Sequence, residues 1–222
     1  MSSREPGPEP AFPTISTERL SLRLFDPARP SDYDALLALY DSDIVKRTLG
    51  NPGVYTREDI DLRAKRFHPR PKDWDSEKRG PFPSHAWHFI YLRDGTDIDT
   101  DAPQGQGQGQ AVGCISLAHR HPLPYPDLGY TVMEPYVNRG YATEAAKAAL
   151  RWWSDEMGVE NIWAAAFDTN VVSQRVARKI GFVDGGEVTV LLDDAVVKQG
   201  KAFVQPGMGR CLDGLTVDVR QK

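Results

Sequence analysis

Residues 129–145 (GYTVMEPYVNRGYATEA) constrain the fold more than any other stretch of the sequence, because two periodicities meet inside them. Residues 128–133 form an apolar run of the kind that a buried strand requires, whereas the residues after Gly140 place alanines and large apolar side chains at helical spacing. The short turn between them sets the start of a helix close to the end of a strand. The chain is therefore expected to fold as an α/β protein.

The same two periodicities divide the remaining chain into strands and helices. Residues 19–25 (RLSLRLF) alternate leucine with polar side chains, as expected of a strand that buries one face. Apolar runs predict further strands at residues 86–92, 111–117, 161–167 and 187–192. Spacings of three and four predict helices after an N-cap at Ser31 and at residues 56–67, 142–157 and 171–180. Residues 69–84 are interpreted as a long loop, and the end of the chain as loop with one edge strand over residues 215–219.

The length of 222 residues, 40% of them hydrophobic, supplies one core and little more, so a single domain over residues 14–222 is expected. Residues 1–13 are polar and rich in proline, which predicts a disordered tail. Residues 94–110 end in a Gly/Gln repeat between two predicted strands and are interpreted as a mobile hairpin tip. Their Gly-x-Gly spacing is no dinucleotide fingerprint, because a strand and not a helix follows it.

Charge and cysteine content limit the classes of partner. Basic residues number 27 and acidic residues 31, so no basic face is expected to collect the phosphates of a nucleic acid. No window approaches the roughly 18 apolar residues of a membrane span, and residues 1–13 lack the apolar run of a secretory signal. Cys114 and Cys211 lack the spacing of a metal knuckle, which favours reduced thiols. We expect a cytoplasmic protein, monomeric or homodimeric, that binds neither nucleic acid nor membrane.

The turn at Gly140 has the features of an anion site. A helix N-terminus offers unpaired N–H groups and the positive end of the helix dipole, and Gly140 and Ala142 let a phosphate approach the backbone. Arg139 either contacts that phosphate or lies in solvent. Taken alone, the same residues also fit an ordinary strand-to-helix turn. Further along, Asn170 is of the type that caps a helix and Gly181 of the type that ends one.

The order of these segments resembles that of the GNAT acetyltransferases, and within them the RimJ/RimL-like branch. The resemblance runs from residues 17–23 (TERLSLR) through the glycine turn and the Asn-x-x-Ser of residues 170–173 to about Gly186. It implies an α/β fold of the α+β type, with a central mixed, mostly antiparallel sheet that is flanked by helices and splayed at the strand that holds the cofactor. It also implies acetyl-CoA as the cofactor.

The resemblance assigns cofactor contacts to individual residues. It implies pantetheine contacts at Val132, Met133, Glu134 and Asn170, and a phosphate loop made of Val137, Asn138, Arg139, Gly140, Tyr141, Ala142 and Thr143. Val137 departs from the Gln or Arg that the superfamily most often has there, although RimJ/RimL-like members often carry an apolar residue. Ala177 stands where many relatives have a tyrosine proposed as general acid, so that role is vacant.

Acetyl transfer to an amine needs a base or a water chain, because an amine with a pKa of about 10 is mostly protonated at neutral pH. The candidate bases bracket the cofactor strand: His119, His121, Asp127 and Glu134. Ser173 is the candidate for the vacant proton-donor role. His119 and His121 also fit a metal pair or solvated loop residues, but no third ligand is identifiable, and no metal is expected. Cys114 lies in a strand without an activating neighbour, which favours direct attack in a ternary complex over an acyl-enzyme.

The sequence thus predicts an acetyl-CoA-dependent N-acetyltransferase that acts on a primary amine, either a small molecule or a protein N-terminus. Two alternatives stay open. The alanine at position 177 suggests a non-catalytic acyl-CoA-binding module, and the same scaffold also suits an O-acyltransferase. No motif identifies the acceptor, because the N-terminal helices and residues 69–84, which would line its pocket, carry no recognisable chemical signature.

Overall fold

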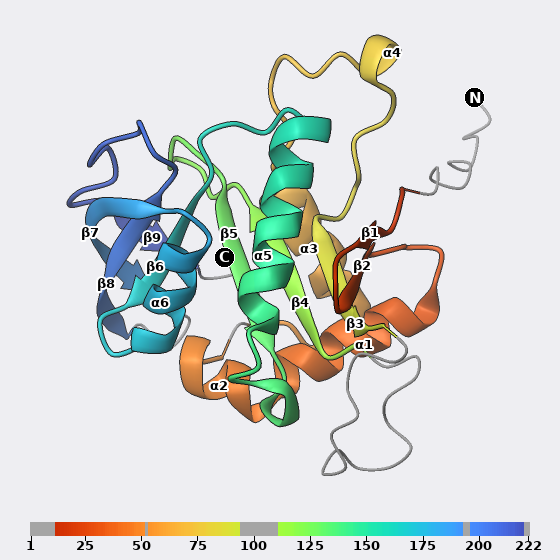
Figure 1. Ribbon diagram of the computed structural model, residues 1–222, viewed down its shortest axis with the longest axis horizontal. Helices are drawn as coiled ribbons and strands as arrows, with labels where there is room; N and C mark the ends of the chain where they lie inside the picture. Colours follow the sequence, from red (N-terminus) through yellow and green to blue (C-terminus); the bar gives the residue numbers. More distant parts are fainter. Residues whose placement is uncertain (1–11, 52, 94–110, 193–195, 220–222) are drawn as a thin grey trace.

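The computed structural model describes residues 12–51, 53–93, 111–192 and 196–219. Within these ranges it contains one mixed sheet of nine strands in the order β1-β2-β3-β4-β5-β6-β8-β7-β9. Helices cover both faces of the sheet: α5 crosses in front of β4 and β5 in Figure 1, and α3 lies behind the strands. The predicted mixed, mostly antiparallel sheet flanked by helices is confirmed.

The first five strands form an antiparallel ladder. They are β1 (Ile15–Ser16), β2 (Leu20–Leu24), β3 (Trp87–Leu92), β4 (Gly113–Ala118) and β5 (Asp127–Val132). Alternate side chains of these strands enter two separate cores. Ile90 and Ile115 belong to the core beneath α5, whereas Phe89 and Cys114 belong to the core beneath α1 and α3. Cys114 is therefore a core residue, in a strand as the sequence predicted.

Four helices connect β2 to β3: α1 (Pro30–Asp41), α2 (Asp43–Leu49), α3 (Arg57–Arg66) and α4 (Ser76–Arg79). The predicted N-cap at Ser31 is wrong, because Arg29 is the cap and Pro30 takes the first helical position, where its missing N–H costs nothing. Helix α2 was not predicted. The cap at Thr56 is confirmed, and the Thr56 and Asp59 side chains form a reciprocal capping box.

β5 and β6 (Trp163–Phe167) are parallel neighbours that separate soon after they begin. Their only register pair is Asp127 with Trp163, at the first residue of each strand. The opening widens toward Val132 and the short 3₁₀ helix η1 (Glu134–Tyr136). The predicted splay at the cofactor strand is thus confirmed, and 128–133 and 161–167 share a sheet as predicted.

The helix expected over 142–157 is built in two parts. α5 (Tyr141–Arg151) continues into the π-helical turn η2 (Trp152–Glu156). Together with α6 (Val171–Lys179), it packs on the sheet face opposite α1 and α3. The alanines Ala145, Ala146 and Ala149 are fully buried against the strands, so the helix approaches the sheet closely.

The C-terminal part of the sheet contains a strand that the sequence analysis missed. β7 (Val183–Leu191) and β9 (Thr216–Asp218) were expected in outline, but β8 (Val197–Val204) lies between β6 and β7 where loop was predicted. Gly200 favoured a loop in the sequence, yet it marks a close approach of two strands, because an added Cβ would lie 2.8 Å from the Ala166 carbonyl oxygen. The edge strand predicted at the end of the chain is confirmed as β9.

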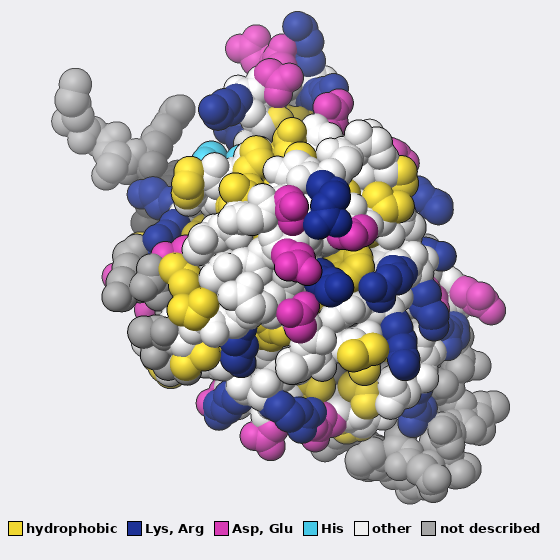
Figure 2. Space-filling model, turned by 90° about the vertical axis from the view of Figure 1, so that its left-hand side faces the viewer, with side chains coloured by type: hydrophobic (Ala, Val, Ile, Leu, Met, Phe, Trp, Pro, Cys, Tyr) yellow, Lys and Arg dark blue, Asp and Glu magenta, His cyan; other side chains and the backbone are white. Residues whose placement is uncertain are grey.

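Two predicted features fall largely outside the described residues. The hairpin tip of residues 94–110 does so entirely, and of the predicted tail only Phe12 and Pro13 are described. Phe12 packs edge-on against Trp152, with ring centroids 6.2 Å apart. Across the described ranges, no helix is long and apolar enough to cross a membrane. Acidic side chains lie among the basic ones on the face in Figure 2, which views the β7 to β9 end of the sheet.

Candidate active site

The turn before α5 holds its backbone in a conformation that only a few residue types tolerate. Gly140 is the N-cap residue of α5 and has a φ of 85°, in the left-handed region that glycine adopts without strain. Asn138, with a φ of 63°, is the second left-handed residue of the turn. No side chain caps the first turn of α5. The first N–H groups of α5 therefore point out of the helix at the open end of β5.

A cluster of polar contacts from the N-terminal part of the chain braces this turn. Arg19 donates through Nε to Glu144 at 2.8 Å and through Nη1 to the carbonyl oxygen of Arg139 at 2.9 Å. The guanidinium also lies over the Tyr141 ring, 4.8 Å from its centroid. The hydroxyl of Thr17 donates to Glu144 at 2.6 Å. We call Thr17, Arg19 and Glu144 the brace.

The brace compensates the negative charge of Glu144, which lies beside the start of α5. Burial alone would raise the pKa of Glu144, but the hydrogen bonds from Thr17 and Arg19 outweigh it and hold that pKa below its usual value. A carboxylate near a helix N-terminus would otherwise repel an incoming anion. Because Arg19 engages both carboxylate oxygens, the charge of Glu144 is compensated locally.

A cavity of about 210 Å³ runs from the opening between β5 and β6 to the space beneath α1, α2 and α3. Its polar lining residues are Tyr40, Thr48, Arg63, Ser116, Arg120, Asp127, Tyr130, Thr131, Asn170 and Ser173. Apolar side chains such as Leu36, Phe67 and Trp87 make up most of the remainder. The volume suits one small group or a short extended chain and is smaller than a typical ligand pocket.

Two groups line the cavity where β5 faces α6. The Asn170 side chain accepts a hydrogen bond from the backbone N–H of Ser173 at 3.0 Å, so the predicted cap is confirmed. The phenol of Tyr130 donates to the Ser173 carbonyl at 2.8 Å and accepts from the Ser173 hydroxyl at 3.0 Å. Sequence reasoning did not single out Tyr130, although it lies in the motif GYTV.

The opposite end of the cavity carries charge. Arg120 and Asp127 form an ion pair, and both side chains are largely buried. Arg63, from α3, lies over the rings of Phe67 and Tyr40 at 5.2 Å and 5.8 Å from their centroids. A guanidinium between aromatic faces is fixed in place, so this end of the cavity has a defined shape. Arg63 and Arg120 were also absent from the sequence-based candidates.

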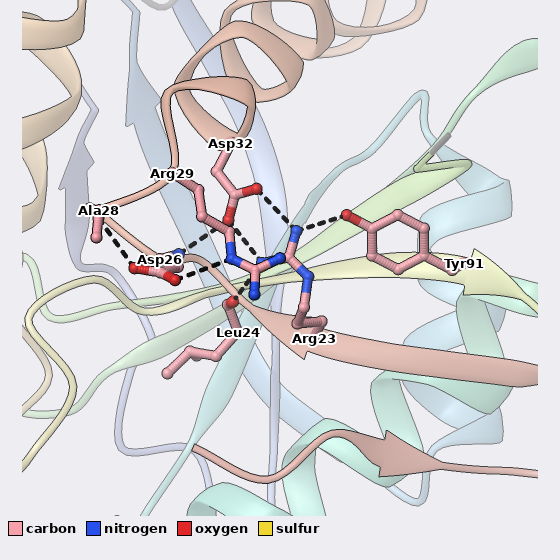
Figure 3. A network of polar contacts seen from close by, with 7 residues as sticks. All are labelled: Arg23, Leu24, Asp26, Ala28, Arg29, Asp32 and Tyr91. Atoms are coloured by element: carbon pink, nitrogen blue, oxygen red, sulfur yellow. Dashed lines mark hydrogen bonds and ion pairs between the residues drawn. The ribbon is translucent and has the colours of Figure 1, made fainter. Parts of the chain in front are cut away.

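Helix α1, which lines part of the cavity, is anchored to the sheet through Arg23 (Figure 3). Its guanidinium donates two hydrogen bonds of 2.7 Å to Asp32 of α1 and a third of 2.8 Å to the Tyr91 hydroxyl of β3. The pKa of Arg23 is raised, chiefly by its hydrogen bond to Asp32. Asp32 also accepts from the backbone N–H of Asp26, at 2.9 Å. The start of α1 is thereby fixed to the sheet.

The sequence-predicted catalytic residues are not brought to one place. Asp127 and Ser173 line the cavity, whereas His119 and His121 line a separate hollow against residues of the 69–84 loop. His119 Nε2 lies 2.9 Å from the Leu123 carbonyl, and burial lowers its pKa. Glu134 follows β5 on the surface and forms an ion pair with Arg47. Only two of the five therefore share a site.

Apart from Asn170, the residues predicted to bind the cofactor lie in one stretch of chain from the end of β5 to the start of α5. Val132 ends β5, and Met133 donates its backbone N–H to the Val112 carbonyl at 2.9 Å. The residues from Val137 to Gly140 lead directly into Tyr141, which is buried, and then into Ala142 and Thr143 of α5. Asn170 lines the cavity, whereas none of residues 132–143 does.

Neither a nucleophilic cysteine nor a metal cluster is evident. Burial raises the pKa of the Cys114 thiol, which keeps it protonated and unreactive. Cys211 is exposed and lies outside the cavity lining. Among the described residues, no group of three or more His, Cys, Asp or Glu side chains could hold a metal ion.

Comparison with known families decides the assignment. The model of the acetyltransferase (GNAT) domain matches residues 19–183, from the brace through the cavity to the start of β7. The chain belongs to the GNAT acetyltransferase family. GNAT proteins transfer acyl groups from acyl-CoA. The chain is also 30% identical over 167 residues to the uncharacterized N-acetyltransferase YnaD of Bacillus subtilis (strain 168), which covers 75% of this chain and 81% of that protein.

Solved GNAT structures share the fold. An acetyltransferase from Agrobacterium tumefaciens strain C58 superposes with a TM-score of 0.56 at 20% identity, over 90% of this chain and 98% of that one. RimL, a ribosomal L7/L12 alpha-N-protein acetyltransferase in complex with coenzyme A, superposes with a TM-score of 0.58 at 16% identity, over 87% of this chain and 97% of that one. At these identities the likeness concerns the fold alone.

Proposed function

We propose that this GNAT protein is an acetyl-CoA-dependent N-acetyltransferase of the RimJ/RimL-like branch that acetylates a primary amine. The observation that carries the proposal is the single register pair between β5 and β6, which leaves the two strands unpaired beyond Asp127 and Trp163, while the chain that continues β5 leads to the uncapped start of α5. A thioester in the opening and a pyrophosphate at the helix start would be a fixed distance apart, as one cofactor requires.

The cofactor side follows from the backbone. The pyrophosphate accepts hydrogen bonds from the first N–H groups of α5, at Tyr141, Ala142 and Thr143, and gains from the helix dipole. Pantetheine extends along Val132 and Met133 into the opening, toward Asn170. A backbone N–H of β5 then stabilises the oxygen of the thioester carbonyl as it gains negative charge.

The acceptor amine enters from the side of α1, α2 and α3. Of the four proposed bases, Asp127 is the one that lines the cavity. Its carboxylate attracts the ammonium form of the acceptor, and its ion pair with Arg120 holds it in place. Asp127 therefore orients the amine while water removes the proton. The buried thiol of Cys114 supports direct attack, because it offers no acyl-enzyme.

A screen of amines with acetyl-CoA tests the proposal by release of the CoA thiol and by the mass of the product. Acetylation of nitrogen is expected for at least one small amine or peptide N-terminus. Binding of CoA without thiol release across the panel would support the non-catalytic module instead. A product acetylated on oxygen would support the O-acyltransferase.

A further inference from the structure

The phenol of Tyr130 lies in the opening between β5 and β6, where the cofactor thioester is proposed to react. Tyr130 lines the cavity and packs against the same core as its strand neighbours Leu128 and Val132. Its ring therefore projects toward α5 and α6, on the face where α5 begins. Gly129 lies on the other face, where an added Cβ would overlap the Ser116 hydroxyl.

The hydroxyl of Tyr130 reaches the first turns of α6. It donates to the Ser173 carbonyl at 2.8 Å and accepts from the Ser173 hydroxyl at 3.0 Å. Burial raises the pKa of Tyr130, while hydrogen bonds from Ser173 and the Ala177 backbone offset part of the rise. The phenol therefore carries its proton throughout the neutral pH range. Ala177, fully buried, leaves the space at this point to the phenol of the strand.

Breaking the thioester bond creates a need for this proton. When the tetrahedral intermediate collapses, the carbon–sulfur bond breaks and its electron pair moves to sulfur, which leaves as thiolate unless a donor is present. Tyr130 and Ser173 are the hydroxyl groups that line the cavity between β5 and α6. A phenol is a far stronger acid than an aliphatic alcohol, so Tyr130 is the better donor of the two.

We propose that Tyr130 is the catalytic residue that protonates the departing CoA sulfur, and that Ser173 positions it. In this step the Tyr130 hydroxyl turns from the Ser173 carbonyl to the sulfur, its O–H bond breaks, a sulfur–hydrogen bond forms, and the electron pair of the O–H bond stays on the phenolate oxygen. The Ser173 hydroxyl already donates to that oxygen and stabilises the phenolate. A solvent proton then restores the phenol, and the amine releases one proton to solvent, so the overall reaction is balanced.

This inference rests on the proposed N-acetyltransferase function, and the first test replaces Tyr130 with Phe. With acetyl-CoA, Tyr130→Phe should lower kcat by about a hundred- to ten-thousand-fold, the range of a lost general acid, while KM for acetyl-CoA changes little. Tyr125→Phe, a tyrosine outside the cavity, is the matched control and should keep the wild-type kcat. An active wild type with a Tyr130→Phe variant within threefold of it would overturn this inference alone. A wild type that transfers acetyl to no amine would overturn the proposed function first.

A second measurement separates proton donation from a merely structural role. S-acetyl-4-nitrothiophenol has a leaving thiol that is much more acidic than the CoA thiol and departs without protonation. The ratio of wild-type to Tyr130→Phe kcat/KM should therefore be large with acetyl-CoA and close to one with this donor. Equal ratios for the two donors would mean that Tyr130 only shapes the cavity, and would overturn the proposal.

A third measurement covers the case in which Tyr130→Phe fails to fold. Incorporation of 3,5-difluorotyrosine at position 130 leaves the ring and hydroxyl in place but lowers the phenol pKa. The alkaline limb of the kcat profile, where activity falls as the donor ionises, should move to lower pH with this residue. An unmoved alkaline limb would overturn the proposal.

Discussion

Arg19 and Glu144 meet across 125 residues of sequence, with the Arg19 Nη2 atom 2.7 Å from a carboxylate oxygen of Glu144. The same guanidinium holds the Arg139 carbonyl, so one side chain fixes both the turn and the helix that follows it. The brace therefore couples the first strands of the sheet to the proposed phosphate site.

We predict that Arg19→Gln weakens acetyl-CoA binding by about tenfold, equivalent to about 1.4 kcal/mol. Its contacts are partly exposed, which limits their contribution, but their loss leaves Glu144 uncompensated beside the incoming pyrophosphate. Calorimetric titration with acetyl-CoA measures the effect. Thr17→Val removes one hydrogen bond to Glu144 and keeps the guanidinium, so it should cost distinctly less. Equal affinity of Arg19→Gln and wild type would contradict the role of the brace.

Gly140→Glu should reduce acetyl-CoA affinity by more than about tenfold, because it adds bulk and negative charge at the helix start. Gly181→Glu is the matched control. Gly181 also has a positive φ, of 102°, but an added Cβ there meets nothing within 4 Å and lies beyond α6. Both variants carry similar backbone strain, so a shared loss of stability is expected and only Gly140→Glu should lose cofactor. Unchanged affinity in folded Gly140→Glu would refute the site.

Variants of the ion-paired residues Asp127 and Arg120 should have similar effects on stability but different effects on the acceptor KM. Removing either partner leaves a buried charge, which typically destabilises a protein by about 3 to 5 kcal/mol. Asp127→Asn and Arg120→Met should thus lower the unfolding midpoint in urea to a similar degree. If Asp127 orients the amine, Asp127→Asn should also raise the acceptor KM, measured at saturating acetyl-CoA, more than Arg120→Met does. The opposite order would assign the acceptor contact to Arg120.

His88 predicts a loss of stability in acid. It is fully buried between Trp152 and Trp153, burial lowers its pKa to about 3, and its ring nitrogens have no hydrogen-bond partner among the described residues. The unfolded chain binds a proton below about pH 6.5 and the folded one does not, so stability falls by up to about 1.4 kcal/mol per pH unit from there to about pH 3.

Replacing this side chain should flatten the dependence. The difference in unfolding free energy between pH 7 and pH 4, measured by chemical denaturation, is expected to be smaller in His88→Leu than in wild type. His121→Leu, at an exposed position, should leave that difference unchanged. An identical acid dependence in His88→Leu and wild type would show that other groups control it.

The sequence predicted the elements whose signals are local. The run of residues 128–133 and the glycine turn after it indicate a strand, a turn and a helix within one short stretch of sequence. The cap at Thr56 is likewise indicated by Thr56 and the three residues that follow it. Gly200 shows the limit of such reasoning. A glycine is needed there because the Ala166 carbonyl of another strand lies close to it, and no local pattern reveals that contact. The same applies to a short helix such as α2, whose seven residues carry too few turns for a periodicity.

The candidate site could be proposed from the sequence only where a backbone motif carries it. The proposed cofactor residues from Val132 to Thr143 lie in one continuous stretch of sequence. Tyr130 and Ser173 stand 43 positions apart, and the sequence around neither residue indicates that they are in contact. Arg63 stands 67 positions before Tyr130, and it likewise joins the cavity through the packing of α3 and not through any local pattern.

The single rung between β5 and β6 makes the sheet mechanically two pieces that meet at a corner formed by Asp127 and Trp163. The five strands from β1 to β5 and the four strands β6, β8, β7 and β9 are each hydrogen-bonded among themselves. A movement of one group relative to the other would therefore break the fewest backbone hydrogen bonds between β5 and β6. We expect a ligand with amide groups along its length, bound between β5 and β6, to join the two parts by hydrogen bonds. It should then stiffen the molecule well beyond the residues that touch the ligand.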